Sequence, residues 1–299
     1  MNKKYLKWID KNIITDLVNK TILITGANSG IGLEVAKYCS YLNMNIIMAV
    51  RNIEKGKIAK EEILKEIPLA NIQIMYVDLS SFTIIDYFVN EIIKKNIHID
   101  FVYHNAGIYN IKNKKSESGH ELMMATNYLG TYYLNEKLVN YFKTKRHLVH
   151  IIFTTSVAAY RTKVDYETFY LCNSTRAIKY YSNSKLMLIH YYKYLINQNS
   201  FNTIFHLVHP GITYTPLFSK GYSKWFTKLI NIFMSICFHK VEKAALCTLK
   251  AMTESTHSYY CPRGLLNVSG YPMKKRLSNK IIRNYQETIS KTEKIIKNK

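Results

Sequence analysis

A tyrosine and a lysine four residues apart, Tyr181 and Lys185, form the pair in this sequence best suited to proton transfer. A phenol titrates near ~10 in water, so a tyrosine is a poor proton donor at neutral pH unless its anion is stabilised. Residues four apart share a helix face, where the Lys185 ammonium can lower the pKa of the Tyr181 hydroxyl. Tyrosine occurs 25 times, however. An isolated tyrosine and lysine four residues apart are also typical of a solvated helix face.

Three glycines, Gly26, Gly30 and Gly32, follow the β-branched run that starts at Thr21 and open an amphipathic stretch. In such a turn the first glycine permits a tight bend, the second lets a cofactor approach the backbone, and the third lets the helix lie close to the sheet. The helix N-terminus then offers free N–H groups to phosphates. The position of this turn between a strand and a helix favours nucleotide binding. Because its spacing differs from the GxGxxG fingerprint, a purely structural glycine turn is also left open.

Short apolar runs alternate with longer helical stretches as far as about residue 270, and this pattern predicts βαβ units that feed a parallel sheet. The predicted strands are 21–25, 45–50, 72–77, 99–104, 148–154, 203–208 and 265–268. The predicted helices are 30–42, 53–67, 81–95, 120–141, 178–196, 241–252 and 279–297. We expect an α/β protein with one Rossmann-type, doubly wound parallel sheet of about seven strands in a single domain.

The segments outside the main pattern suggest three parts. Residues 1–19 are expected to form an amphipathic arm, because Tyr5, Ile9, Ile13 and Leu17 recur at helical spacing. Residues 20–275 are expected to form the catalytic domain, with a substrate lid around 212–240, and residues 276–299 a basic C-terminal helix. The apolar stretch 225–238 is too short to span a bilayer, and a lid, ordinary core and a monotopic membrane contact all remain open for it.

The composition is that of a folded globular protein, with 47% hydrophobic and 21% charged residues and a formal net charge of +22. Lysines are spread along the chain without a nucleic-acid-binding motif, so no specific nucleic-acid partner is expected. Five cysteines form neither a CxxC pair nor a metal-ligand spacing, which predicts a reducing compartment and no metal site. Charges interrupt every apolar run near the N-terminus, so we expect a protein that is not secreted but cytoplasmic or peripherally membrane-associated.

Further motifs occur in register with the glycine turn and the Tyr/Lys pair, and together they resemble the short-chain dehydrogenase/reductase family. The run TGANSGIG at 25–32 resembles its cofactor loop, and Tyr181-Ser-Asn-Ser-Lys185 its YxxxK motif. His104-Asn105-Ala106-Gly107 is similar to its NNAG element, with His where the first Asn is usual. The 25-residue step from Ser156 to Tyr181 and the segment 48–52 look like the NADP-dependent, retinol-dehydrogenase-like branch.

The resemblance implies four catalytic residues. Tyr181 would be the general acid in reduction and the general base in oxidation, with Lys185 as its electrostatic partner. Ser156 would donate a hydrogen bond to the substrate oxygen, and Asn127 would hold a water that relays protons from Lys185. Taken alone, Ser156 is more typical of a turn cap and Asn127 of a structural hydrogen-bonding residue.

The end of the second strand indicates the cofactor. NAD enzymes typically place an acidic residue there, whereas this sequence has Arg51 and Asn52. A guanidinium suits a 2′-phosphate, so NADP(H) is expected rather than NAD(H), and a solvated strand-end charge is the alternative. Asn105 is expected to hold the backbone on the adenine side. The resemblance also implies cofactor contacts from Gly26, Asn28, Ser29, Gly30, Ile31, Gly32, Asp78, Leu79, Asn105, Ala106, Gly107, Tyr181, Lys185, Pro210, Gly211 and Thr213.

The sequence therefore predicts an NADP(H)-dependent oxidoreductase that moves a hydride between nicotinamide and the carbonyl or alcohol carbon of a small, lipophilic substrate. A nucleotide-binding or membrane-surface protein of the same fold without turnover is the alternative, although such a protein would be expected to lose the Tyr/Lys pair. A homodimer and a peripheral membrane contact are left open.

Overall fold

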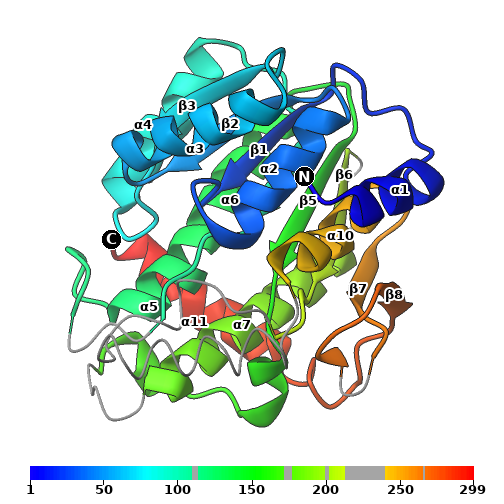
Figure 1. Cartoon of the computed structure of the whole chain (residues 1–299). Coiled ribbons are helices and arrows are strands. Elements are labelled where there is room, and N and C mark those ends of the chain that lie inside the picture. The colour runs from blue at the N-terminus through cyan, green and yellow to red at the C-terminus, as the bar shows by residue number, and fades with distance from the viewer. Residues whose placement is uncertain (110–113, 172–176, 199–201, 213–239, 265–266) are drawn as a thin grey trace, which may run out of the picture.

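A single eight-stranded sheet runs through the centre of the computed structural model (Figure 1). The structure describes residues 1–109, 114–171, 177–198, 202–212, 240–264 and 267–299. The strands are β1 (Thr21–Thr25), β2 (Asn45–Val50), β3 (Ile72–Tyr76), β4 (Phe101–His104), β5 (Val149–Thr154), β6 (Thr203–Val208), β7 (Ser258–Pro262) and β8 (Pro272–Lys275). Their order is β3-β2-β1-β4-β5-β6-β7-β8. All neighbours pair in parallel except β7 and β8, which are antiparallel.

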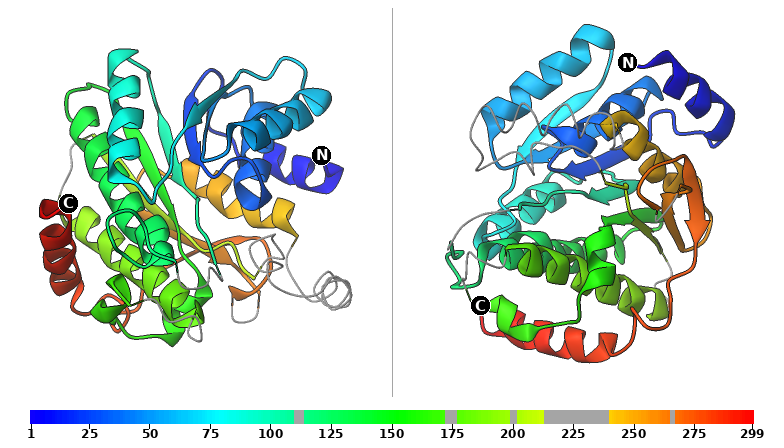
Figure 2. Two further views of the ribbon diagram at one scale, coloured as in Figure 1. Left: turned by 90° about the vertical axis from the view of Figure 1, so that its left-hand side faces the viewer. Right: turned by 60° about the horizontal axis from the view of Figure 1, so that its bottom comes forward.

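Helices cover both faces of the sheet (Figure 2), as parallel strands joined by crossovers require. One face packs against α1 (Lys3–Asn12), α2 (Gly30–Tyr41), α3 (Ile53–Glu66) and α10 (Val241–Met252). The other packs against α4 (Phe82–Lys94), α6 (Gly130–Phe142) and α7 (Ala177–Asn197), with α11 (Tyr285–Lys297) lying on α7. Short helical turns complete the fold: α5 (Leu122–Met124), a π-helical turn (Ala125–Leu129) and 3₁₀ turns at Val157–Arg161 and Tyr166–Phe169.

The strands are apolar runs because both of their faces are buried. In β1, Leu23 points into the core beneath α4, α6 and α7, whereas Ile22 and Ile24 point into the opposite core. The chain moves from β1 outward to β2 and β3 and then returns to β4 on the other side of β1. The carboxyl ends of β1 and β4 therefore border the point where strand order reverses, which is where open α/β sheets bind ligands.

The N-terminal arm packs on the sheet domain. Tyr5, Ile9, Ile13 and Leu17, the residues whose helical spacing predicted an inward face, are all buried. The ring of Trp8 stacks on Tyr271 with centroids 5.7 Å apart. These contacts fix α1 beside α10.

The last strand was predicted at the wrong position, and the sheet has eight strands where about seven were expected. The real β7 ends at Pro262, and a hairpin connects it to β8, since Arg263 N–H donates to the Tyr271 carbonyl at 2.9 Å. Asn267, with φ of 57°, and Val268 belong to this connection, while 265–266 lie outside the described residues. The sequence pattern favours the apolar run 265–268 as the strand, whereas the aromatic run just before it, Ser258–Pro262, forms β7 of the sheet.

Two helices begin later than predicted. The helix expected from residue 120 starts at Leu122, because the Glu121 carboxylate accepts the Met124 N–H at 2.8 Å as its N-cap. The helix expected from residue 279 starts at Tyr285, after Asn284 adopts a left-handed conformation with φ of 61°.

Candidate active site

The glycine turn after β1 is shaped by contacts that exclude side chains. Gly26 and Gly30 have φ of 67° and 56°, in the left-handed region that favours glycine. A Cβ on Gly32 would lie 2.5 Å from both the Gly26 carbonyl oxygen and the Asn105 Nδ2. Ser29, at the N-cap of α2, makes no side-chain bond to the helix, and the other predicted loop contacts, Asn28 and Ile31, are partly exposed. The start of α2 thus offers an open cradle of the kind that binds phosphates.

Asn105 braces this cradle from the end of β4. Its Nδ2 donates to the carbonyls of Thr25 at 3.0 Å and Gly26 at 3.3 Å. The N–H groups of Asn105 and Ala106 both donate to the Thr25 hydroxyl at 3.1 Å. The backbone-holding role expected for Asn105 is therefore what the hydrogen bonds show.

The residues predicted to contact the adenosine half lie at the ends of β2 and β3. Arg51 is exposed, and no salt bridge to it is recorded within the described part of the chain. The Asn52 side-chain oxygen caps α3 by accepting the Lys55 N–H at 2.9 Å. Asp78 accepts the N–H and the hydroxyl of Ser80 at 2.9 and 2.7 Å, and the Leu79 carbonyl lies against Gly130. Among the described residues at these strand ends, Arg51 thus has an exposed guanidinium that forms no salt bridge with another described residue.

Tyr181 and Lys185 face the end of β5 from the first half of α7. Both side chains are buried, and the Lys185 Nζ lies 5.9 Å from the centroid of the Tyr181 ring. The Lys185 ammonium donates to the Thr154 carbonyl at 3.0 Å. Ser156 lies beside the Tyr181 hydroxyl, and its Oγ accepts the Ala158 N–H at 3.3 Å. The structure therefore brings these three predicted catalytic residues together.

Burial dominates the ionisation of this pair. It raises the pKa of the Tyr181 phenol, and the hydrogen bond with Ser156 opposes that rise. Burial lowers the pKa of the Lys185 ammonium to about 8. The direction for Tyr181 is opposite to the one expected from its pairing with Lys185, because burial disfavours the charged phenolate.

Asn127, the fourth predicted residue, lies fully buried in the π-helical turn, where the Gly130 N–H donates to the Ala125 carbonyl. Its side-chain amide pairs with the backbone of Ile108, accepting the N–H at 2.7 Å and donating to the carbonyl at 2.9 Å. A Cβ on Gly107 would lie 3.4 Å from the Asn127 Oδ1 and 3.6 Å from the Lys185 Nζ. Asn127 thus positions residues 107–108 beside Lys185, and its role in holding a water stays a prediction.

The predicted Pro210-Gly211 element follows β6. Gly211 has φ of 88°, and a Cβ there would collide with the Val268 carbonyl. Ile212 N–H donates to the same carbonyl at 3.0 Å, which ties the element to the β7–β8 connection. Thr213 and the stretch 225–238 proposed as a lid lie outside the described residues.

Two features of the site were missed by sequence reasoning. An apolar cluster surrounds Tyr181, formed by Ile108, Tyr109, Met123, Ala158, Ala177 and Tyr180. The Tyr109 ring meets the Tyr181 ring edge-on, with centroids 5.3 Å apart. The Thr154 carbonyl that holds Lys185 was missed as well, because a backbone acceptor leaves no signal in the residue types.

His104, which replaces the usual Asn before Asn105, points away from this cluster. It is buried against Phe153, with ring centroids 5.0 Å apart, and its Nε2 lies 3.1 Å from the Asn135 Oδ1. Burial lowers its pKa to about 4, so the imidazole is neutral at pH 7. Its role is in the packing beneath the site.

A doubly wound sheet with a glycine cradle at its reversal point defines a Rossmann-type dinucleotide-binding protein. A sequence model of the family described as short chain dehydrogenase matches residues 20–224, more than half of the chain. This chain belongs to that short chain dehydrogenase family.

Individual relatives agree. Over 213 residues the chain is 30% identical to the short-chain dehydrogenase TIC 32 B, chloroplastic, of Brassica napus, with 68% of this chain and 67% of that protein covered. It is 30% identical over 205 residues to mouse (Mus musculus) retinol dehydrogenase 13, with 66% of this chain and 60% of that protein covered. The matches span from about a third to about two thirds of the length of the curated relatives.

The fold is shared with solved structures. An uncharacterized protein from Mycobacterium paratuberculosis has a TM-score of 0.73 at 20% identity, with 94% of this chain and 95% of that chain covered. Within the described residues, no helix has the length and apolar character needed to cross a membrane. No group of three or more His, Cys, Asp or Glu suited to a metal ion is found in that same part of the chain.

Proposed function

We propose that this protein is an NADP(H)-dependent oxidoreductase that interconverts a carbonyl and an alcohol on a lipophilic small molecule. The observation that carries the proposal is the grouping of Ser156 and the Lys185 ammonium around Tyr181, with the Lys185 Nζ 5.9 Å from the centroid of the tyrosine ring. This group lies at the carboxyl ends of β4, β5 and the start of α7, the same side of the sheet as the glycine cradle.

The residues present fit a nicotinamide dinucleotide. Side chains at Gly26 and Gly32 would collide with the neighbouring chain, and Gly30 has a positive φ of 56°, so the turn keeps the bare backbone that a pyrophosphate approaches. Arg51 supports the choice of NADP(H), because an exposed guanidinium can make charge-assisted hydrogen bonds with a 2′-phosphate. When bound, the cofactor supplies or accepts the hydride.

The chain's own residues would handle the substrate oxygen. The Ser156 hydroxyl, beside that of Tyr181, would donate to that oxygen and stabilise its developing negative charge. The Tyr181 hydroxyl would transfer its proton to the same oxygen during reduction and recover a proton afterwards. Lys185, held by the Thr154 carbonyl, would stabilise the phenolate by its charge.

The apolar cluster around Tyr181 supports a lipophilic substrate. Tyr109, Met123 and Ala158 place aromatic and aliphatic surface next to the reacting hydroxyl, where it would exclude water and receive an apolar chain. The relationship to retinol dehydrogenase 13 points the same way.

The test is a panel of long-chain and short-chain aldehydes and ketones offered to the full chain with NADPH, followed by the loss of nicotinamide absorbance. Tyr181→Phe should lower turnover by about two orders of magnitude or more while NADPH affinity is kept. Tyr192→Phe is the matched control on the same helix, because the Tyr192 hydroxyl instead donates to the Ser258 carbonyl at 3.2 Å. Unchanged turnover in Tyr181→Phe would refute the assignment, and NADPH binding without turnover of any substrate would favour a nucleotide-binding protein.

A further inference from the structure

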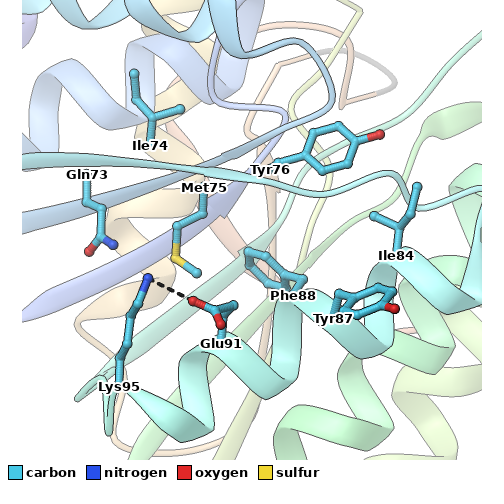
Figure 3. A pocket seen from close by; sticks show the side chains of 9 residues that line it. All are labelled: Gln73, Ile74, Met75, Tyr76, Ile84, Tyr87, Phe88, Glu91 and Lys95. Carbon is cyan, nitrogen blue, oxygen red and sulfur yellow. Dashed lines mark ion pairs between the residues drawn. The ribbon is translucent and has the colours of Figure 1, made fainter.

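Glu121 is a buried glutamate at the start of α5, beside the proposed active site. It is 1% exposed, and within the described residues no lysine, arginine or histidine forms an ion pair with it. Glu91 shows the contrasting arrangement, because it lies in the groove of about 420 Å³ between β3 and α4 and pairs there with Lys95 at 2.8 Å (Figure 3). The Glu121 side chain therefore acts as a hydrogen-bond acceptor and not as one half of an ion pair.

The hydrogen bonds of Glu121 join three segments of the chain. Its Oε2 accepts the Met124 N–H at 2.8 Å, which caps α5. Its own N–H donates to the Phe169 carbonyl at 2.9 Å, and the neighbouring Leu122 N–H donates to the Lys114 carbonyl at 2.9 Å. Glu121 thus stands where the segment 114–121, the 3₁₀ turn that ends at Phe169 and α5 meet.

The 3₁₀ turn gives this junction a fixed support on α7. The side-chain amide of Asn183, two residues after Tyr181, donates to the Asp165 carbonyl at 2.6 Å and to the Thr168 hydroxyl at 2.5 Å. Phe169 is 1% exposed and belongs to the core on the α7 side of the sheet. The cap of α5 is therefore anchored to the helix that bears Tyr181.

Two residues that follow Glu121 belong to the proposed site. Met123, 1% exposed, packs in the apolar cluster around Tyr181. Asn127 lies in the π-helical turn, which is linked to the cap because the Ala125 N–H donates to the Glu121 carbonyl at 2.8 Å. A change in the direction of α5 would therefore shift both the apolar surface against Tyr181 and the amide of Asn127.

We propose that Glu121 is a positioning residue for the proposed reaction, whose side-chain oxygen holds the start of α5 and thereby keeps Met123 and Asn127 in place. This inference rests on the oxidoreductase activity proposed above. Glu121 acts through hydrogen bonding and not through its charge, so a neutral side chain of the same shape should replace it. The glycine cradle lies on other elements, so NADPH affinity should not depend on Glu121.

The ionisation of Glu121 gives this role a signature in pH. Burial raises the pKa of its carboxyl to about 7, while the nearby N–H groups of Met124 and Met123 oppose the rise. The segments packed around it carry the following titratable side chains: Lys114, Lys115, His120, Glu167, Tyr170, Tyr180 and Tyr181. Burial, and not the charge of any of these groups, raises the pKa.

The closed junction consequently prefers the neutral acid. The ordinary pKa of the group is 4.5, and its value in the folded chain is about 7. Protonated Glu121 therefore contributes stability that is full below pH 4.5 and is lost as pH rises to about 7. Opening of the start of α5 should become easier across this window.

The first test compares two substitutions by kcat and NADPH affinity at pH 7, with a substrate found in the aldehyde and ketone panel. Glu121→Leu removes the acceptor and should lower kcat about ten-fold or more while NADPH affinity is kept. Glu121→Gln keeps an oxygen for the Met124 N–H, and its kcat should stay within about two-fold of the parent. Glu136→Gln is the matched control, because that carboxylate lies on α6 and accepts the Tyr191 hydroxyl at 2.5 Å.

The second test needs no turnover, so it separates this inference from the proposed activity. Hydrogen exchange at the Met124 amide, corrected for the intrinsic rate, should speed up about ten-fold or more between pH 5 and pH 7.5 in the parent. Glu121→Gln should show no such change, whereas Glu91→Gln, at the exposed ion pair of Figure 3, should behave as the parent does.

The outcomes of the two tests are distinguishable. A parent that turns over no substrate would refute the proposed function, and exchange would still report on the junction. A Glu121→Leu protein with parental kcat would overturn the positioning role, as would a Glu121→Gln protein impaired as strongly as Glu121→Leu. Equal pH dependence of Met124 exchange in the parent and in Glu121→Gln would also overturn it. Exchange compares only these two proteins, so it remains decisive if Glu121→Leu folds poorly.

Discussion

Replacing Gly32 by alanine tests how the cofactor cradle is built. A Cβ at this position would lie 2.5 Å from the Gly26 carbonyl oxygen and 2.5 Å from the Asn105 Nδ2. Both are tighter than van der Waals contact allows, so either the turn or the Asn105 side chain must move. The contact with Gly26 is to backbone, and a change of rotamer cannot relieve it.

The expected cost follows from the contacts that Asn105 makes. Its Nδ2 holds the Thr25 and Gly26 carbonyls at 3.0 and 3.3 Å, and losing these two bonds costs about 0.5 to 1.5 kcal/mol each. Crowding adds about 1 to 3 kcal/mol. Alanine returns about 1 kcal/mol, because it is the better helix former. The free energy of unfolding should therefore fall by about 1 to 5 kcal/mol.

Urea unfolding measures this loss of stability, and titration with NADPH measures the affinity of the cradle for the cofactor. Affinity should fall about ten-fold or more, because displacement of the Gly26 backbone closes the approach to the helix N-terminus. Asn105→Ala and the double variant complete a cycle. Since the two residues share one contact, the double variant should lose less stability than the sum of the single losses. A Gly32→Ala protein with parental stability and NADPH affinity would refute the reasoning.

The remaining predictions concern charge. Arg51→Asp should reduce or invert a preference for NADPH over NADH of about ten-fold to a hundred-fold, and a parent without preference, by Michaelis constants for both cofactors, would contradict it. Because burial lowers the pKa of Lys185 to about 8, carbonyl reduction by the free enzyme should fall above that pH, and a kcat/KM profile with no alkaline limb near pH 8 would contradict it. Burial lowers the pKa of His104 from 6.5 to about 4, so stability is full above pH 6.5 and is lost as pH falls toward 4. This contribution is about 3 kcal/mol, and His104→Asn should make urea stability depend less on pH over that window.

The sequence predicted the fold well where apolar residues recur in a regular pattern or where motifs occur in a fixed order along the chain. Six strands and most helices were placed within a few residues, because buried parallel strands are continuous apolar runs. The family was also identified correctly, since the glycine turn and the Tyr/Lys pair occur in order along the chain. The last strand was missed because the apolar run at 265–268 and the aromatic run of β7 have similar composition. Only pairing with β6, through Leu207 and Tyr259, distinguishes them.

The site's electrostatics could not be predicted from spacing. Helical periodicity puts Lys185 on the same face as Tyr181, but it says nothing about burial, and burial decides both pKa directions. The hydrogen bonds of Asn127 to Ile108 depend on a π-helical turn, which has no sequence signature of its own. The contacts of Asn52 with the start of α3 were likewise hidden, because a cap and a cofactor ligand call for the same residue type.

The segment after β4 joins the cofactor cradle to the proton-transfer residues. Asn105 holds the glycine turn, while two residues later Gly107 lies between Asn127 and Lys185, and Ile108 pairs with the Asn127 amide. Because Asn105 and Gly107 are only two residues apart, a displacement of Asn105 should also shift the backbone next to Lys185. It follows that Gly32→Ala should lower turnover at saturating NADPH, in addition to weakening its binding. A variant that recovered full turnover once saturated would show instead that the two halves of the site move independently.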